Sequence, residues 1–158
     1  MFNSQSEMNR VYVSRTNALD PLASFSRHSF VLEEVEWPSV EHYYQAMKFE
    51  DPELREAIRA AGHPMDAQKL AKKNKRRVRP DWNKVKETFM TRGVYIQCRT
   101  HPEVANALLR TGEKELIENS QYDYYWGCGR DGRGGNAFGR ILMEVRERLR
   151  HEAAGLYP

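Results

Sequence analysis

Prolines divide the middle of the chain into short helical segments, and this feature limits the possible folds more than any other in the sequence. Pro52, preceded by the N-cap residue Asp51, opens a helix that Gly62 closes. Pro64 stops that helix from continuing, because proline lacks the N–H group that a helix interior needs. The helices expected from such signals span Val40–Glu50, Pro52–Gly62, Met65–Asn74, a longer stretch from Pro80 through Ile96, Val104–Arg110 and Asn136–Arg150.

Short strands are expected between and beside these helices. The β-branched and aromatic residues of Arg10–Ser14 favour a strand, and the alternation over Ser29–Trp37 favours one or two more. Lys114–Glu118 is expected to form another short strand. The sequence therefore predicts an α+β, mostly α-helical, single domain over residues 1–158, with frayed ends at 1–9 and 151–158.

Composition excludes several classes of protein. Hydrophobic residues make up 40% and charged residues 30% of the 158 residues, which is typical of a folded water-soluble chain rather than a disordered one. No apolar run approaches the ~20 residues of a membrane-spanning helix. Cys98 and Cys128 cannot form a disulfide framework, which indicates a reducing compartment. We expect an intracellular protein, cytoplasmic or, in a eukaryote, nuclear, with no metal because no CxxC or HxxxH motif occurs.

The segment Trp37–Phe49, WPSVEHYYQAMKF, is the first candidate for chemistry. Glu41, Gln45 and Lys48 stand at i, i+4 and i+7, so they are expected to share one helix face among aromatic residues. A carboxylate there can move protons or orient water at a sugar C1′, and an amine can form a Schiff base with an aldehyde-like carbon. The alternative is a solvent-exposed polar stripe on an amphipathic helix.

A glycine-rich segment, which we call the glycine loop, is the second candidate. Trp126–Gly139, WGCGRDGRGGNAFG, holds six of the ten glycines and leads into the last expected helix. Glycines allow a close approach of the backbone to a ligand, and free N–H groups at a helix start can bind anions. The tyrosines and Trp126 at its start could stack on a base. The alternative is a surface loop in which glycines serve only the turns.

A basic segment is the third candidate. Lys69–Arg79, KLAKKNKRRVR, carries seven basic residues in eleven, although the net charge of the whole chain is only +3. Such a segment could contact the phosphates of a nucleotide or of a nucleic acid. The alternative is the solvated surface of a charge-rich helix.

Two of these segments carry a resemblance to a known family. Between about Leu22 and Arg148 the chain resembles the NADAR family, also called YbiA-like, most specifically in WPSVEHYYQAMKF and in YWGCGRDGRGGNAFGRILMEVR at Tyr125–Arg146. RPDW, VKETFM and ALLRTGEKELIE, which lie between the two motifs, support the resemblance. It implies a compact, mostly helical domain and an N-glycosidase that cleaves a ribose C1′–N bond without a metal or other cofactor.

The resemblance also implies roles for individual residues. The catalytic residues that it implies are Glu41, Lys48 and Asp131, and the substrate-binding residues, with neighbours added from the candidate segments, are Ser24, Phe25, Tyr44, Arg77, Trp126, Gly127, Gly129, Arg130 and Asn136. Lys48 is expected to capture C1′ as a Schiff base while Glu41 moves protons. Ser24 departs from the family pattern, because Leu-Ala-Ser-Phe stands here where the family often has Leu-Ser-Asn-Phe.

The expected function is removal of ADP-ribose from ADP-ribosylated guanine in nucleic acid, with DNA held through Lys69–Arg79. One alternative is hydrolysis of ribosylamino-pyrimidine phosphates, intermediates of riboflavin biosynthesis. A second is a non-enzymatic module that binds ADP-ribose or nucleic acid, which would not need Glu41 and Lys48 together.

Overall fold

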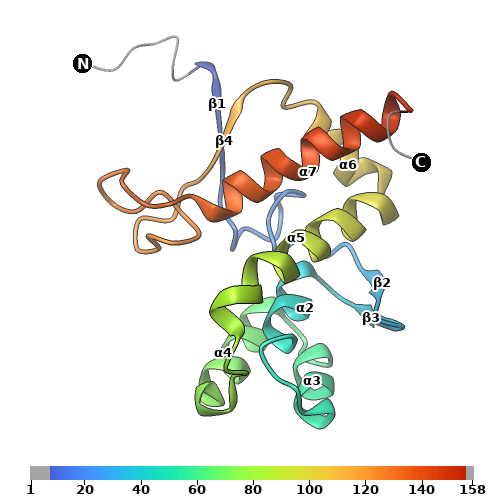
Figure 1. Ribbon diagram of the computed structural model, residues 1–158, viewed down its shortest axis with the longest axis vertical. Helices are drawn as coiled ribbons and strands as arrows, with labels where there is room; N and C mark the ends of the chain where they lie inside the picture. Colours follow the sequence, from blue (N-terminus) through green and yellow to red (C-terminus); the bar gives the residue numbers. More distant parts are fainter. Residues whose placement is uncertain (1–7, 156–158) are drawn as a thin grey trace. The chain divides into compact units, whose positions relative to one another are not determined.

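The computed structural model of the protein describes residues 8–155, and the chain divides into two compact units. One unit is Ser24–His101, and the other comprises the described parts of Met1–Ala23 and Pro102–Pro158. The single domain expected over residues 1–158 stays a prediction. Figure 1 shows the elements of both units, each of which is described by itself below.

The Ser24–His101 unit contains most of the helices. Its elements are β2 (Phe30–Leu32), β3 (Val35–Trp37), α2 (Val40–Ala46), α3 (Pro52–Arg59), α4 (Pro64–Lys73), the 3₁₀ turn η1 (Lys75–Arg77) and α5 (Trp82–Thr100). The expected cap Asp51 is confirmed, since its side chain accepts from the N–H of Glu53 at 2.9 Å, and the side chain of Ser39 caps α2 by accepting from the N–H of His42 at 3.1 Å. Each satisfies a donor that the first helical turn would leave unpaired.

Helix α2 is shorter than the expected Val40–Glu50, and Lys48 lies beyond its end. The N–H groups of Lys48 and Phe49 donate to carbonyls three residues earlier, which closes the helix in a tight turn. Asp51 is then extended, as the residue before a proline prefers, so the chain cannot stay helical up to Pro52. The expectation that Lys48 shares a helix face with Glu41 and Gln45 is therefore wrong.

All seven residues of α2 are buried, because α3, α4, α5 and β3 pack around it. Tyr43 lies at the centre, and its ring meets those of Phe30, Trp37 and Phe89 edge to face. Burial raises the pKa of the Tyr43 phenol to about 12. The packing places a helix with several polar residues in the interior of this unit.

The other unit joins the two ends of the chain. Its elements are β1 (Arg10–Val13), α6 (Pro102–Leu109), β4 (Glu115–Glu118) and α7 (Ala137–Ala153). Strands β1 and β4 pair in parallel, with Val11 opposite Leu116, and α7 packs against β4 and α6. Apolar residues at helical spacing form one face of α7, and all five are buried: Phe138, Ile141, Leu142, Val145 and Leu149.

The frayed end expected at 151–158 begins too early. Helix α7 continues through Ala153, and His151 forms an i,i+4 pair with Glu147 that supports its last turn. At the other end, the carbonyl of Asn9 accepts from the N–H of Glu115 at 2.8 Å and extends the β1–β4 pairing. The rest of the two expected frayed ends, 1–7 and 156–158, lies outside the described residues.

Within residues 8–155, no helix is long and apolar enough to cross a membrane. The same part of the chain contains no group of three or more His, Cys, Asp or Glu side chains that could hold a metal ion. Both cysteines have free thiols, and burial raises the pKa of Cys98 to about 12, which makes that thiol a poor nucleophile.

Candidate active site

The carboxylate of Glu41 is buried in the first turn of α2 and is surrounded by neutral hydrogen-bond donors. The exposed fraction of Glu41 is 0%. The hydroxyl of Ser24 donates to Oε2 at 2.7 Å, while Gln45 and Gln68 donate through Nε2 to Oε1 at 2.8 and 3.0 Å. We call these four residues the Glu41 cluster. The donors can compensate a buried negative charge, and they fix the direction in which the carboxylate points.

Three segments of one unit build the Glu41 cluster. Glu41 and Gln45 are one helical turn apart on α2, which confirms this half of the predicted face. Ser24 stands before the hairpin that β2 and β3 form by antiparallel pairing, and its carbonyl also accepts from the backbone N–H of Glu41 at 2.9 Å. Gln68 comes from α4, and sequence reasoning missed it because no local spacing relates a residue on α4 to one on α2.

Ser24 was expected to contact substrate, which stays a prediction, and its hydroxyl donates to Glu41. The hydroxyl can donate only one hydrogen, so the bond to Glu41 leaves it only acceptor capacity for another group. The departure from the family pattern thus falls on a residue that touches the carboxylate.

Lys48 lies with aromatic residues of the same unit. Its ammonium nitrogen is 5.5 Å from the ring centroid of Tyr44, and the side chain is half-buried. Tyr44 in turn packs against Trp82, with ring centroids 5.1 Å apart. The Lys48 carbonyl accepts from the N–H of Arg79 at 2.8 Å, which fixes the backbone after α2. The structure therefore brings two predicted residues, Lys48 and Tyr44, together.

Two further predicted residues of this unit make contacts typical of structural residues. Phe25 is buried, and its ring meets that of His63 edge to face at 6.1 Å. Arg77 forms an ion pair with Asp51, the residue that caps α3. The hydrogen bond from the backbone N–H of Glu53 and, to a smaller extent, the Arg77 guanidinium lower the pKa of the Asp51 carboxyl.

The glycine loop belongs to the other unit, and it is held together by its own backbone. The N–H groups of Asn136, Ala137 and Phe138 donate to the carbonyls of residues 127, 125 and 126 at 2.9–3.1 Å. Two of these, the N–H groups of Ala137 and Phe138, belong to the first turn of α7 and are groups that an anion at the helix start would need, but they are already bonded to carbonyls.

Three predicted residues lie inside this folded loop. The Asn136 side chain bridges Glu118 N–H and Leu116 C=O, and thereby ties the start of α7 to β4. Gly127 has no room for a side chain, because a Cβ there would lie 2.3 Å from Oε2 of Glu118. Trp126 is buried, with Arg15 lying 5.6 Å above its ring.

The remaining predicted residues of the loop lie nearer its tip. Gly129 has a φ of 71°, a conformation that glycine adopts without strain. Arg130 and Asp131 are exposed within their unit, and the Asp131 carboxylate accepts from the N–H of Arg133 at 3.1 Å. The structure thus divides the predicted set: Glu41, Lys48 and Tyr44 are in one unit, and Trp126, Arg130 and Asp131 are in the other.

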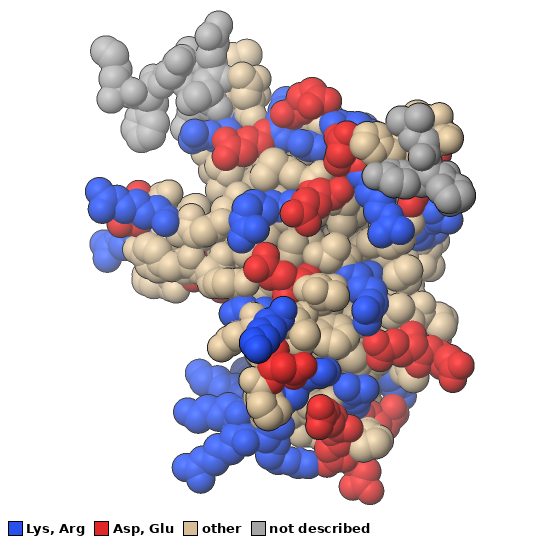
Figure 2. Space-filling view, in the orientation of Figure 1, with Lys and Arg blue, Asp and Glu red and all other residues tan. Residues whose placement is uncertain are grey.

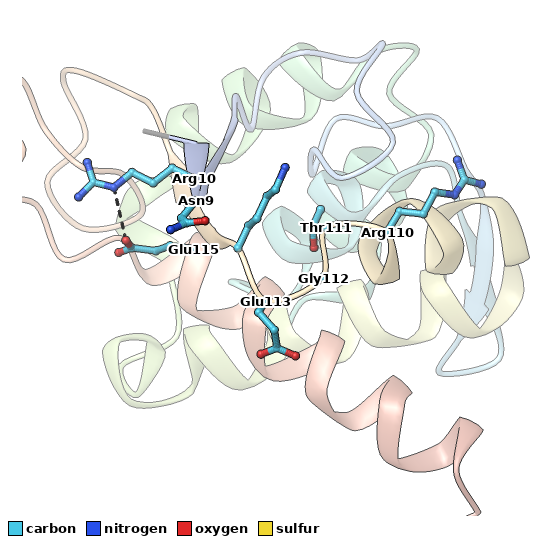
Figure 3. Close-up of a pocket in the computed structure, with 8 residues that line it drawn as sticks. Asn9, Arg10, Arg110, Thr111, Gly112, Glu113 and Glu115 are labelled. Atoms are coloured by element: carbon cyan, nitrogen blue, oxygen red, sulfur yellow. Dashed lines mark ion pairs between the residues drawn. The ribbon is translucent and has the colours of Figure 1, made fainter. Parts of the chain in front are cut away.

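Two hollows of this second unit contain none of the predicted residues. One, of about 660 Å³, lies beside β1 and the turn before β4, and Figure 3 shows the Arg10–Glu115 ion pair at its edge. The other, of about 310 Å³, is lined by Arg15, Glu118 and Asp123 among others. Glu118 is buried and accepts from the N–H groups of Arg15 and Ser120, which makes it a structural anchor of the loop.

A group of exposed cations covers α4 and η1. Figure 2 shows Lys and Arg side chains gathered where α4 lies in Figure 1. The basic surface, as we call it, consists of Lys69, Lys72, Lys73, Lys75 and Arg76, which are all exposed. The other two basic residues of the segment, Arg77 and Arg79, are paired with Asp51 and Asp81.

Comparison with known proteins places these features in a family. The sequence model of the NADAR domain matches residues 1–150. The chain is 39% identical over 140 residues to an N-glycosidase of Nostoc punctiforme, covering 85% of this chain and 90% of the relative. It is 40% identical over 113 residues to N-glycosidase YbiA of Escherichia coli (strain K12), covering 72% and 71%. The NMR structure of E. coli YbiA matches with a TM-score of 0.82 and 33% identity, covering 92% of this chain and 87% of that one.

A riboflavin biosynthesis protein of Vibrio vulnificus is 40% identical over 132 residues, which are 84% of this chain and 36% of that relative. The likeness to the E. coli structure confirms the expected fold, mostly helical with a few short strands. The expected enzyme class, hydrolases of N-glycosyl bonds, is the one for which the Nostoc and E. coli relatives are named. Because a model of the domain matches nearly the whole chain and these relatives exceed 30% identity, the chain belongs to the NADAR family.

Proposed function

We propose that the protein is an N-glycosidase that hydrolyses the bond between C1′ of a ribose and a nitrogen of a nucleobase. The observation that carries this proposal is the Glu41 carboxylate, buried and fixed by three donors. A fixed carboxyl group can protonate a leaving nitrogen when it is in its acid form, or activate water when it is ionised, as such groups do in glycosidases. The names of the Nostoc and E. coli relatives support the same reaction class.

Lys48 has the chemistry for a covalent route. Its neutral amine would bond to C1′ as the C1′–N bond breaks, and the leaving nitrogen would take a proton. Opening of the ribose ring then gives a Schiff base, and water cleaves it to release the aldehyde sugar and restore the amine. The net reaction adds one water across the C1′–N bond. Glu41 would supply and remove the protons in this sequence.

Borohydride separates this route from direct attack by water. With Lys48 as the nucleophile, borohydride added during turnover reduces the Schiff base and leaves one sugar adduct on the chain, which mass spectrometry locates on Lys48. Lys48→Ala should give no adduct and no turnover, while its thermal unfolding stays close to that of the parent because the side chain is only half-buried. Turnover at the parent rate by Lys48→Ala would remove lysine from the mechanism.

For the substrate, we favour ADP-ribosylated guanine in nucleic acid. The support is the basic surface, whose five exposed cations exceed what one pyrophosphate needs. A second candidate, a ribosylamino-pyrimidine phosphate, is favoured by the name of the Vibrio relative. Both substrates present the same ribose C1′–N bond to Glu41, so the catalytic proposal is common to them.

A product assay decides between the two substrates. The protein is incubated in excess with an ADP-ribosylated oligonucleotide or with a ribosylamino-pyrimidine phosphate, and the released sugar is quantified over a single turnover. Release of ADP-ribose with recovery of unmodified guanine supports the nucleic-acid class, and release of ribose 5-phosphate supports the other. If neither sugar appears although ADP-ribose binds, the N-glycosidase proposal is excluded and a binding module takes its place.

A further inference from the structure

The side-chain amide of Gln45 is bound at one end and unbound at the other. Gln45 stands in the last turn of α2 and is 5% exposed. Its Nε2 donates to Oε1 of Glu41 at 2.8 Å. While Glu41 is ionised it only accepts hydrogen bonds, so turning the amide round would place two acceptors together. Its Oε1 is therefore fixed in direction, and within residues 8–155 this buried oxygen has no hydrogen-bond partner.

Gln68 shows that a glutamine can donate to Glu41 without having a buried carbonyl that lacks a partner. It donates to the same oxygen of Glu41, at 3.0 Å, from α4. Its own carbonyl is not among the buried side-chain atoms that lack a partner in the described chain. A buried carbonyl without a partner destabilises a fold, so its presence beside a fixed carboxylate indicates a binding role. Gln45 is thus the one of the two glutamines whose carbonyl is both buried and without a partner in the described chain.

We propose that Oε1 of Gln45 accepts a hydrogen bond from the hydroxyl on C2′ of the ribose that is cleaved. The inference rests on the proposed function, in which Glu41 acts at C1′. C2′ is bonded to C1′, and Gln45 Oε1 belongs to the amide whose nitrogen touches Glu41, so the C2′ hydroxyl is the first sugar donor within reach. In glycosidases, hydrogen bonds to this hydroxyl strengthen in the transition state. Gln45 would then select ribosyl over 2′-deoxyribosyl substrates.

A double comparison tests this role. The kcat/KM of the ribosyl substrate and of its 2′-deoxyribosyl analogue are measured with the parent, with Gln45→Met and with the matched control Gln68→Met. The intrinsic reactivity of each sugar is the same for all three proteins, so the ratio of the two values reports only the enzyme's preference. We expect Gln45→Met to lose at least about tenfold of the parent's preference for ribose, and Gln68→Met to keep it.

Each outcome decides the proposal. An unchanged preference in Gln45→Met would overturn the proposal, because Gln45 would then not sense the C2′ hydroxyl. An equal loss of preference in Gln68→Met would overturn it as well, because the loss would then come from disturbing Glu41. If Gln45→Met does not fold, Gln45→Asn retracts the carbonyl by one methylene and should lose the preference likewise. If the parent cleaves neither substrate, the proposed function fails, and calorimetry with ribose 5-phosphate and 2-deoxyribose 5-phosphate tests Gln45 alone. Equal or no binding of the two sugars by the parent would contradict its role.

Discussion

The Glu41 cluster and the glycine loop are both rich in hydrogen bonds, and they use them in opposite ways. In the Glu41 cluster, side chains from α2, α4 and the segment before the hairpin converge on one buried carboxylate. In the glycine loop, the backbone bonds to itself, and its polar side chains at 130 and 131 are exposed within their unit. One region fixes a reactive group, and the other fixes a backbone path.

This difference indicates what each region contributes. A carboxylate held by three neutral donors is oriented before any substrate arrives, which is the arrangement that proton transfer needs. At the start of α7, the N–H groups of Ala137 and Phe138 are bonded to backbone carbonyls of residues 125 and 126. Its ligand contacts would come from side chains such as Arg130. We therefore expect substitutions in the Glu41 cluster to change catalysis, and substitutions in the loop backbone to change stability first.

The largest expected effect is that of Glu41→Gln. The variant keeps the size of the side chain and removes the charge, so the rate of C1′–N cleavage should fall by about 10²–10⁴. Substrate binding should change less than kcat, which single-turnover and binding measurements separate. An unchanged kcat in a folded Glu41→Gln protein would show that the buried carboxylate has only a structural role.

The parts of this comparison that sequence predicts are those with local causes. The starts of α2 and α3 follow from Ser39, Asp51 and Pro52, because caps and prolines act on neighbouring N–H groups. The apolar face of α7 follows from helical periodicity in the same way. Spacing made Glu41 and Lys48 candidates, the resemblance to the family favoured them over an exposed polar stripe, and their assignment as site residues stays a prediction.

The parts that sequence does not predict depend on distant residues. Val11 pairs with Leu116 across more than a hundred residues, and no local pattern relates the two strands. Gln68 reaches Glu41 only because α4 packs on α2. The early end of α2 was missed because polar and aromatic residues continue past Ala46, whereas the extended residue before Pro52 requires a turn.

The loop side of the comparison is tested by Gly127→Ala. A Cβ at this position would lie 2.3 Å from Glu118 Oε2, so the variant should lose about 1–3 kcal/mol of unfolding free energy. Urea unfolding measures the loss. Gly132→Ala is the control in the same loop: its φ of 75° disfavours alanine by about 1–2 kcal/mol, but a Cβ there meets nothing within 4 Å. Comparable folding of Gly127→Ala and the parent would contradict the tight packing of this loop.

The salt dependence of binding compares the cations of the basic surface, which lies in the same unit as the Glu41 cluster, with the cation Arg130 of the glycine loop. If the basic surface binds nucleic acid, each phosphate contact adds about 0.7–0.9 to the negative slope of log affinity against log salt concentration. Reversing Lys72, Lys73 and Lys75 to Glu should therefore flatten the slope for an ADP-ribosylated oligonucleotide by about two to three units. Arg130→Glu, in the glycine loop, is the matched charge reversal and should remove about one. Equal, shallow slopes for the parent and the triple variant would exclude the basic surface and favour the small substrate.

The smallest expected effect concerns His42, which shares α2 with Glu41 and is fully buried. Nδ1 lies 2.7 Å from the Ser39 hydroxyl and Nε2 lies 2.9 Å from the Ala61 carbonyl, contacts that a neutral ring with its proton on Nε2 satisfies. Desolvation by burial lowers the His42 pKa below its usual 6.5, so between the two pKa values the unfolded chain binds a proton that the folded chain does not.

This stabilising contribution is thus complete above pH 6.5 and is lost as the pH falls toward the folded pKa, by at most about 1.4 kcal/mol per pH unit for one proton. Urea unfolding at pH 7.5 and 5.5 should show a larger acid-induced loss for the parent than for His42→Gln. Other titrating groups are common to both proteins, so the difference reports His42. An equal loss in both would mean that α2 accepts a charged imidazole, and that the interior around Glu41 is less apolar than its packing indicates.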